Sequence, residues 1–437
     1  MSQNRRSLTS ASGLILLRRL LQLVDLKFAY RELSAKHQEY QSSDQAFRAY
    51  LNSRHFLEYG IFELWNRSFA IGQNQRKSRI FEADVYGFSA AVLEIYDLLS
   101  EAGKRDLRRR LRGGIRQGGD LRDLRLECDV YTHITQIGLG ILPFENPKGK
   151  GFDFLVANSD FEAELEVKHI STHKGHKIHR GDFAKIGECF STRRSLLEDI
   201  PAHRIALVTL VDRFPQDAEE QQVLIDDVLT AGVRGSSVRK LGYKIEVVEA
   251  NKANIPSMTE YEDQAEYQEA LRRAAEKQIG VENTSMCVAF AEKGTIFSVL
   301  FTSSEPTRYI QQIEKTIKEA TFNQLSGTKP GFIIVGLEGI DRNSMESLRE
   351  GRRLGNGHFV GLSALAYRVF VGCESQHLAG LAFLGDPMLC TSRLPDNHFL
   401  PPGATRSFVS ERPVYSVANP RAQDHLGVFR AIFNASN

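Results

Sequence analysis

Apolar residues recur at helical spacing through the first hundred residues of the chain. Phe47 is followed three and four residues later by Tyr50 and Leu51, and similar spacing continues to Trp65. Such a period places the apolar side chains on one face of a helix, and the scarcity of β-branched runs argues against strands. The pattern therefore predicts a helical N-terminal domain over residues 1–119.

From residue 120 the pattern changes to short apolar strands separated by amphipathic helices. Strands are expected over residues 152–156, 161–170, 205–211, 244–248, 285–290, 296–302, 332–337 and 378–384. Helices are expected over residues 121–137, 182–197, 216–229, 259–279, 307–325 and 358–371. This alternation predicts an α/β fold, with a mixed sheet flanked by helices, over residues 120–390. Residues 391–437 are rich in Pro, Asn, Arg and Ser and are expected to form an irregular C-terminal tail.

The composition is typical of a folded globular protein. Of the 437 residues, 42% are hydrophobic and 25% are charged, which excludes collagen-like and wholly disordered classes. The five cysteines lie far apart without a CxxC pair, so neither a zinc ribbon nor a secreted disulfide framework is expected. The apolar stretch 14–24 is short and is interrupted by Arg18 and Arg19, which favours an amphipathic helix over a membrane span. We therefore expect a cytoplasmic protein that does not enter a membrane.

The net charge of +2 conceals a basic N-terminal part of the chain. Residues 1–125 carry 22 Lys and Arg against 14 Asp and Glu. Much of this excess lies between residues 104 and 125, where arginines alternate with leucines and two glycine pairs interrupt the run; the arginines concerned include Arg108, Arg109, Arg110 and Arg112. Two interpretations stay open: the arginines contact nucleic-acid phosphates, or they lie on a solvated helix face.

The expected strand at residues 161–170 alternates strictly between apolar and charged residues. Alternate side chains of a strand point to opposite faces, so Glu162, Glu164, Glu166 and Lys168 share one face and Phe161, Ala163, Leu165 and Val167 share the other. The charged face has two interpretations. It lies in solvent, or it brings Glu166 and Lys168 to a functional site.

A second carboxylate is expected next to this strand. Asp153 is embedded in the apolar strand 152–156, and a turn at residues 157–160 would let the two strands pair antiparallel, with Asp153 close to Glu166. Carboxylates are hard oxygen ligands that suit Mg²⁺ or Mn²⁺, and such an ion lowers the pKa of a bound water and offsets charge on a pentavalent phosphate. Lys168 would orient or activate that water, or stabilise the developing charge.

The preceding helix supplies a third carboxylate. Leu124, Glu127, Tyr131 and Ile134 follow 3-4-3 spacing, which places Glu127 on the inward face. A carboxylate in that position needs a cation or a hydrogen-bond donor, and a metal site would be such a partner. Alternatively, Glu127 lies at the edge of the apolar stripe and reaches solvent.

These residues resemble the PD-(D/E)xK nuclease superfamily, which has the restriction-endonuclease-like fold. The resemblance covers the helix with Glu127, the Gly-rich turn, Asp153 in GKGFDFLV and the pair Glu166 and Lys168 in ELEVKHIS. It implies that Asp153 and Glu166 bind a divalent ion, that Lys168 assists the nucleophilic water, and that Glu127 helps through the metal's shell. Phe152 stands where the family has a proline.

The short [DE]-x-K pattern also occurs at Asp25 and Lys27. That copy lies within a segment of helical period and has no partner acid on a neighbouring strand, whereas Glu166 and Lys168 follow one hairpin after Asp153. Context therefore favours the second copy as the site.

Histidines and basic residues gather directly after the candidate strand: His169, His173, Lys174, His176, Lys177, His179 and Arg180. No cysteine or second histidine pair with tetrahedral-site spacing lies nearby, and Gly175 argues against a single ligand-bearing helix. We favour a basic loop in which Lys174, Lys177 and Arg180 grip the phosphate backbone. Ordinary exposed histidines and a metal site are the alternatives.

The chain has no GxxxxGK[ST] loop, no GxSxG and no HExxH, so a P-loop ATPase, an α/β-hydrolase and a zincin are not expected. Residues and resemblance together lead to the expectation of an Mg²⁺- or Mn²⁺-dependent DNA nuclease, acting in restriction, phage defence or repair. The alternative is a catalytically silent, nuclease-like subunit that binds nucleic acid or serves as a scaffold in a larger complex. A protein partner for the N-terminal helices and homo-oligomerisation both stay open.

Overall fold

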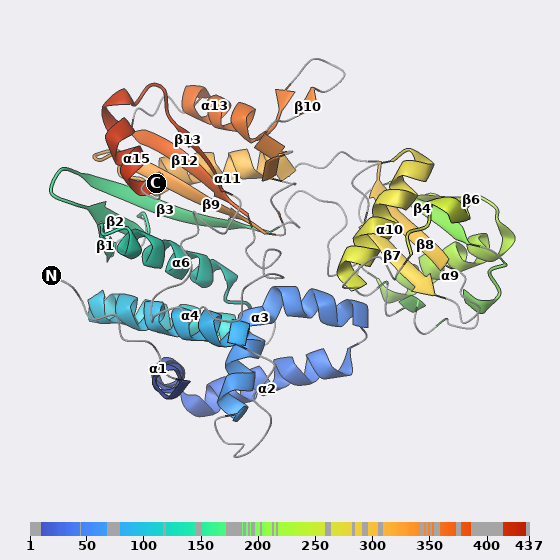
Figure 1. Ribbon diagram of the computed structural model, residues 1–437, viewed down its shortest axis with the longest axis horizontal. Helices are drawn as coiled ribbons and strands as arrows, with labels where there is room; N and C mark the ends of the chain where they lie inside the picture. The colour runs from blue at the N-terminus through green and yellow to red at the C-terminus, as the bar shows by residue number, and fades with distance from the viewer. Residues whose placement is uncertain are drawn as a thin grey trace. The chain divides into compact units, whose positions relative to one another are not determined.

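The computed structural model (Figure 1) describes residues 10–43, 45–67, 79–116, 119–145, 151–171, 203–211, 217–257, 264–281, 285–290, 296–304, 309–338, 359–372, 377–385 and 414–433, with short pieces elsewhere in 186–215 and 340–353. The chain forms two compact units. Unit 1 comprises Met1–Gln41, Asn52–Lys174 and Tyr309–Asn437, and unit 2 comprises Ser42–Leu51 and Gly175–Arg308.

The chain begins with helices: α1 (Ser10–Leu23), α2 (Leu26–Ser42), α3 (Gln45–Arg67), α4 (Arg79–Leu98), α5 (Glu101–Ile115) and α6 (Arg122–Gln136). The expected amphipathic helix at residues 14–24 is confirmed by α1, which buries Leu17, Leu20 and Leu21 and exposes Ile15. No described helix has the length and the apolar character that crossing a membrane requires.

Unit 1 is built around a six-stranded mixed sheet with the order β1-β2-β3-β9-β12-β13. The strands are β1 (Gly140–Pro143), β2 (Phe154–Ala157), β3 (Glu162–Ile170), β9 (Gly331–Leu337), β12 (Leu378–Leu384) and β13 (Val414–Ala418). β3, β9 and β12 run parallel, while β1, β2 and β13 pair antiparallel with their neighbours. Parallel strands are usually covered on both faces, and β9 and β12 are indeed buried along their whole length.

Helices cover both faces of this sheet (Figure 1). α11 (Tyr309–Asn323) and α13 (Leu362–Gly372) pack on one face, and α6 and α15 (Leu426–Phe433) pack on the other. The approach of α6 is close, since a Cβ at Gly336 of β9 would lie 2.5 Å from Leu126 of α6. This contact holds α6, and with it Glu127, against the sheet.

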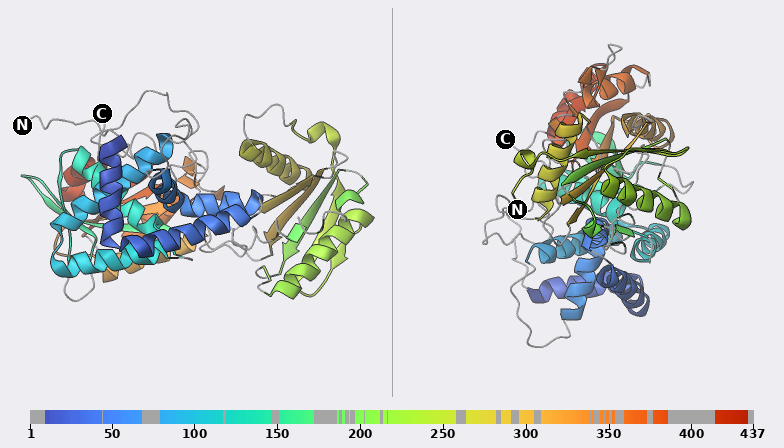
Figure 2. Two further views of the ribbon diagram at one scale, coloured as in Figure 1. Left: turned by 90° about the horizontal axis from the view of Figure 1, so that it is seen from below. Right: turned by 90° about the vertical axis from the view of Figure 1, so that its right-hand side faces the viewer.

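Unit 2 has a five-stranded sheet of its own with the order β5-β6-β4-β8-β7. Its strands are β4 (Arg204–Leu210), β5 (Val238–Arg239), β6 (Tyr243–Glu249), β7 (Ser285–Phe290) and β8 (Ile296–Ser303). α9 (Ala218–Arg234) packs on one face and α10 (Gln264–Ile279) on the other (Figure 2). The smaller elements of the chain are η1 (Lys252–Asn254), β10 (Arg352–Arg353), β11 (Phe359–Val360) and η4 (Gln423–His425).

The predicted fold class is confirmed, because the chain forms mixed sheets flanked by helices. All eight predicted strands exist, and their ends agree to within two residues. The helices predicted at 121–137, 216–229, 259–279, 307–325 and 358–371 also exist, as α6, α9, α10, α11 and α13. Of the helix predicted at 182–197, only short pieces lie within the described residues.

The predicted domain boundaries need three corrections. The N-terminal helices do not stand apart, because the apolar residues of α1 and α4 join those of α6 and β3 in one core. Residues 120–390 do not form one domain, because unit 2 interrupts unit 1 between β3 and α11. The tail predicted at 391–437 is not irregular throughout, since β13 and α15 belong to unit 1, whereas residues 391–413 lie outside the described residues.

Candidate active site

The hairpin of β2 and β3 positions the first two predicted site residues. The strands pair antiparallel with Phe154 opposite Leu165, so Asp153 and Glu166 are the next cross-strand neighbours. The Asp153 amide donates to the Leu165 carbonyl at 3.1 Å, and the Val167 amide donates to Oδ2 of Asp153 at 2.8 Å. The predicted antiparallel hairpin is thus present, and it holds the Asp153 carboxylate beside Glu166.

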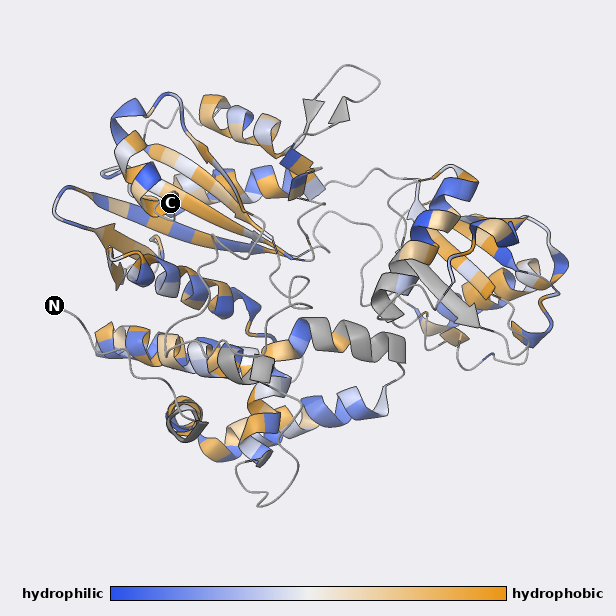
Figure 3. Cartoon of the chain, viewed as in Figure 1, coloured by the Kyte–Doolittle hydropathy of each residue, from blue (hydrophilic) through white to orange (hydrophobic). Residues whose placement is uncertain are grey.

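Both faces of β3 are buried, so the solvent-facing interpretation of its charged residues is wrong for Glu164 and Glu166, which are 1% and 0% exposed. Hydrophilic and hydrophobic residues alternate along β3, whereas the neighbouring strands β9 and β12 are mainly hydrophobic (Figure 3). Glu162, at the start of the strand, is exposed, and Lys168, near its end, is partly exposed. The reason is topological, because β3 pairs with β2 and β9 and has helices on both faces.

The two buried glutamates differ in how their oxygens are satisfied. Glu164 accepts from the Ser326 amide at 2.7 Å and also from the Ser326 hydroxyl. Neither oxygen of Glu166 has a hydrogen bond of acceptable geometry within the described part of the chain, although Oε1 contacts the Lys168 ammonium. An unsatisfied buried carboxylate is costly, so Glu164 is a structural residue while Glu166 lacks a structural explanation.

Glu127 reaches the same cluster from α6. Its side chain is 13% exposed and forms an ion pair with Arg110 of α5. The Asp153 charge lies close enough to raise the pKa of Glu127, and the Glu127 charge raises that of Glu166. Glu127 therefore faces inward, and its cationic partner in this structure is Arg110.

The three carboxylates repel one another in a buried setting. Burial and the Glu166 charge raise the pKa of Asp153 from 3.8 to about 7, against the opposing effects of the Val167 amide and Lys168. Burial and the Asp153 charge raise the pKa of Glu127 from 4.5 to about 7, although Arg110 opposes this. Burial also raises the pKa of Glu166, while Lys168 opposes it. Such shifts cluster at functional sites, because folding alone would select against them.

Among the described residues, no three His, Cys, Asp or Glu side chains are arranged to hold a metal ion. Lys168 and Arg110 are the cations that contact the carboxylates instead. The donor chemistry nevertheless fits a hard divalent cation, since the cluster offers carboxylate oxygens only and the Glu166 oxygens lack hydrogen bonds. Asp153 and Glu166 are the side chains that would hold the ion.

Sequence reasoning missed several charged residues that extend the cluster. The sequence pattern does not separate Arg110 from the neighbouring arginines as a partner of the cluster. Its position next to the buried residues Leu107 and Leu111 is the signal that could have identified it as an inward-facing arginine. Further along, His169 Nδ1 lies 3.0 Å from an Asp123 oxygen, and Arg122 contacts Glu338 just after β9. Periodicity alone could not indicate these pairs, because each joins α6 to a different strand.

The arginines of α5 make contacts within unit 1. Arg108 donates to the Lys104 carbonyl and lies over the Tyr96 ring, while Arg112 donates to the Val24 carbonyl. Arg109 is 81% exposed and pairs with Asp106. The solvated-face interpretation therefore suits Arg109, whereas Arg108, Arg110 and Arg112 have intramolecular partners. Contact with phosphates remains a prediction for all four.

The other predicted site residues have different outcomes. Asp25 caps α2 by accepting from the Lys27 and Phe28 amides, so the first [DE]-x-K copy is structural. The predicted phosphate-binding residues Lys174, Lys177 and Arg180, together with His173, His176 and His179, lie outside the described residues.

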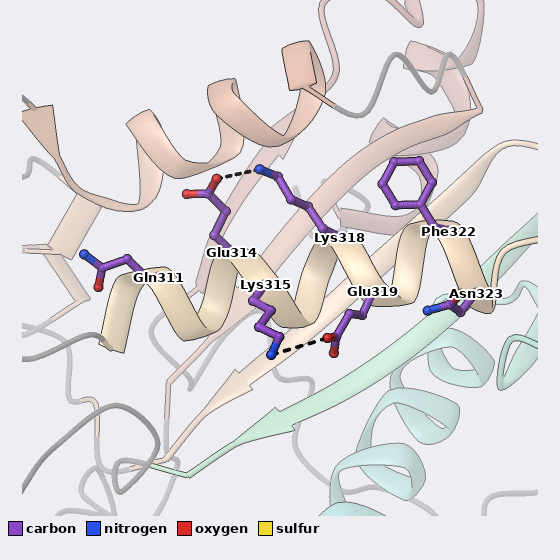
Figure 4. Close-up of a pocket in the computed structure, with 7 residues that line it drawn as sticks. All are labelled: Gln311, Glu314, Lys315, Lys318, Glu319, Phe322 and Asn323. Carbon is purple, nitrogen blue, oxygen red and sulfur yellow. Dashed lines mark hydrogen bonds and ion pairs between the residues drawn. The ribbon is translucent and has the colours of Figure 1, made fainter.

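A surface hollow of about 390 Å³ lies elsewhere, along α11 (Figure 4). Glu314 pairs with Lys318, and Lys315 pairs with Glu319, so its charges largely compensate one another. All of its lining residues come from this one helix, and none belongs to the carboxylate cluster. We therefore do not assign the chemistry to this hollow.

Comparison with known proteins finds no similarity: no family model, curated protein or solved structure matches the chain.

Proposed function

We propose that the chain is a metal-dependent nuclease that hydrolyses phosphodiester bonds in DNA at the cluster of Asp153, Glu166, Lys168 and Glu127. The observation that carries the proposal is the Glu166 carboxylate, which is fully buried beside two further carboxylates with the Lys168 ammonium as its cationic contact. Folding gains nothing from such repulsion, whereas a bound cation would turn it into attraction. The resemblance to PD-(D/E)xK nucleases assigns the same residues.

The roles follow from where each side chain lies. Asp153 and Glu166, neighbours across the hairpin, would hold a Mg²⁺ or Mn²⁺ ion. Such an ion supplies a water of lowered pKa and offsets charge on the phosphate. The Lys168 side chain, 26% exposed, is accessible enough to hold the attacking water and to stabilise charge on the phosphate oxygens. Glu127, held by Arg110, would assist through a water of the ion's shell.

A specific observation favours the second candidate, a nuclease-like subunit without catalysis. Lys168 and Arg110 already contact the carboxylates, and the described residues contain no ready-made group of three ligands. On this reading the two cations are permanent counter-charges. The carboxylates would then bind no divalent ion, and the cluster would have no catalytic role.

Incubation of the full chain with plasmid and linear DNA separates the two candidates. The nuclease is expected to nick or degrade DNA with Mg²⁺ or Mn²⁺, and EDTA and Lys168→Ala should each abolish this. Glu162→Gln is the matched control, because Glu162 lies on the same strand but is exposed and pairs with Lys329. If the wild-type chain fails to cleave DNA with every divalent ion in the assay, the second candidate is favoured. Cleavage that survives Lys168→Ala would overturn the role given to Lys168.

A further inference from the structure

Arg110 is held against the carboxylate cluster by the way α5 and α6 are joined. It lies on α5 between Leu107 and Leu111, which are 4% and 0% exposed, so this turn of the helix packs in the core of unit 1. A Cβ at Gly114, near the end of α5, would lie 2.4 Å from a side-chain carbon of Leu121, at the start of α6. The two helices therefore approach closely just beyond Arg110.

A buried lysine holds this junction. Lys36 of α2 is 1% exposed, and its ammonium donates to the carbonyls of Gly114 at 3.0 Å and Gly119 at 2.6 Å. It also donates to Glu58 of α3 at 3.2 Å, and Glu58 accepts from the Leu121 amide. A buried ammonium needs such partners, because an unpaired charge in the interior is costly. These contacts therefore fix the spacing of α5 and α6.

The Arg110 guanidinium lies in the field of two carboxylates. It forms an ion pair with Glu127. Burial lowers the pKa of this guanidinium, but the Glu127 and Asp153 charges outweigh burial and hold the pKa above its ordinary value. The Arg110 side chain is nevertheless 38% exposed. Such a cation can act on an ion that the carboxylates bind and also on a charged substrate that approaches from solvent.

The five charged side chains of the cluster leave it slightly negative. Asp153, Glu166 and Glu127 carry three negative charges when ionised, and Lys168 and Arg110 carry two positive charges, so their net charge is −1. A bound divalent ion would change this net charge to +1, and a phosphodiester with its single negative charge would then neutralise it. The empty cluster, in contrast, repels a phosphodiester.

The neighbouring acids Asp106 and Asp123 change this balance little. Asp106, which acts on the guanidinium, is itself paired with Arg109. Asp123, which acts on the carboxylates, has a side chain that is 75% exposed and lies beside His169. Charges that are paired or surrounded by water and salt act weakly at a distance. The balance therefore depends on the five side chains of the cluster.

We propose that Arg110 sets the charge of the site, so that it weakens the binding of the divalent ion and strengthens the binding of the phosphodiester. The inference rests on the proposed function, and it gives Arg110 a role beyond that of holding Glu127. The same positive charge opposes the ion and attracts the substrate, so its removal should change the two affinities in opposite directions.

The test measures both affinities on the full chain at pH 8. Electron paramagnetic resonance of the free ion gives the Kd for Mn²⁺ without DNA, and cleavage of a labelled duplex at saturating Mn²⁺ gives KM. Arg110→Met should lower the Kd for Mn²⁺ about tenfold and raise KM about tenfold, since one unit charge is removed from a partly buried site. Arg110→Lys keeps the charge and should stay close to the wild type in both. A merely structural residue would weaken both affinities together.

A double variant keeps the test valid if Arg110→Met folds poorly, because that variant leaves the buried Glu127 carboxylate without its cation. Glu127→Gln alone should weaken Mn²⁺ binding about tenfold. Adding Arg110→Met restores the net charge and should return the Kd to within about threefold of the wild type. Arg109→Met is the matched control, since Arg109 is the adjacent arginine of α5 but is 81% exposed and pairs with Asp106. Its Kd for Mn²⁺ should not change.

The outcomes distinguish this inference from the proposed function. If the wild type binds Mn²⁺ and cleaves DNA but Arg110→Met binds Mn²⁺ no more tightly, the inference is overturned and the nuclease proposal stands. The same holds if the double variant binds Mn²⁺ as weakly as Glu127→Gln alone. If Arg109→Met has the same effect as Arg110→Met, the charge of α5 as a whole is responsible and the inference is overturned. If the wild type neither binds Mn²⁺ nor cleaves DNA, both fall.

Discussion

Replacing Asp153 by asparagine is expected to stabilise the protein and to remove its activity. The pKa of Asp153 is raised from 3.8 to about 7 by burial and by the Glu166 charge. In the unfolded chain this carboxyl ionises near pH 4, whereas the folded protein keeps it protonated until about pH 7. Folding is therefore penalised by a cost that grows with pH across this window and is constant above it. Asparagine carries no charge, and its carbonyl can still accept from the Val167 amide.

The magnitude follows from the size of the shift. One pKa unit corresponds to about 1.4 kcal/mol, so the shift from 3.8 to about 7 corresponds to a cost of about 4 kcal/mol above pH 7. At pH 5 only about 2 kcal/mol of this cost has developed. The stability gained by Asp153→Asn should thus be larger at pH 8 than at pH 5 by about 2 to 3 kcal/mol. Glu127, whose pKa is also raised to about 7, titrates together with Asp153 and broadens the transition.

Urea unfolding between pH 5 and pH 8, followed by circular dichroism, measures this gain. Glu162→Gln serves as the control, since the Glu162 side chain is 54% exposed and pairs with Lys329 outside the carboxylate cluster. A variant Asp153→Asn that is less stable than the wild type at pH 8 would refute the reasoning. A gain that stays constant between pH 5 and pH 8 would refute it equally, because the repulsion would then not come from ionisation of Asp153.

Three further predictions concern the cluster and its ion. Cleavage should be abolished by each of the substitutions Asp153→Ala, Glu166→Ala and Lys168→Ala. A double variant should be no less active than the least active single variant, because the effects of residues that act as a unit are not additive. A Lys168→Ala protein of wild-type activity would contradict this prediction. Glu127→Gln should weaken cleavage in a way that higher Mn²⁺ partly restores, and an unchanged metal dependence would remove Glu127 from the ion's shell. Mn²⁺ at a hundred times its Kd should stabilise the wild type by about 2.7 kcal/mol in the same unfolding assay, and an equal effect on Asp153→Asn would place the ion elsewhere.

Local patterns predicted eight strands of the two sheets but not the way the chain divides between the sheets. The strands of unit 1 and unit 2 have the same apolar character, so nothing local shows that β4 pairs with β8 while β3 pairs with β9. Glu164 and Gly331 are opposite each other across β3 and β9, although all of unit 2 beyond residue 174 lies between them in sequence. Pairing over such a distance depends on the packing of whole layers, which no window of the sequence contains.

The missed elements are short or have a misleading composition. β1 has four residues, with Gly140 and Pro143 at its ends, and an edge strand of this kind tolerates both. The strand β13 and the helix α15 adjoin a stretch rich in proline and asparagine, and this composition led to the prediction of an irregular tail. The burial of both elements depends on β12. The site was more accessible to prediction, because alternation along β3 and the hairpin turn together determine which face Asp153 and Glu166 share.

Alternation could not, however, distinguish Glu164 from Glu166, and this difference leads to a last prediction. Both lie buried on one face of β3, but the Ser326 amide and hydroxyl satisfy Glu164. Glu164→Gln should therefore cost about 1 to 3 kcal/mol of stability and leave the rate of plasmid nicking unchanged. Glu166→Gln should abolish nicking and increase stability above neutral pH, since burial raises the pKa of this carboxyl and penalises its ionised form in the folded state. Unfolding and nicking measured on both variants decide the matter. If Glu164→Gln lost activity at unchanged stability, or if both variants behaved alike, hydrogen-bond satisfaction would not separate the structural glutamate from the functional one.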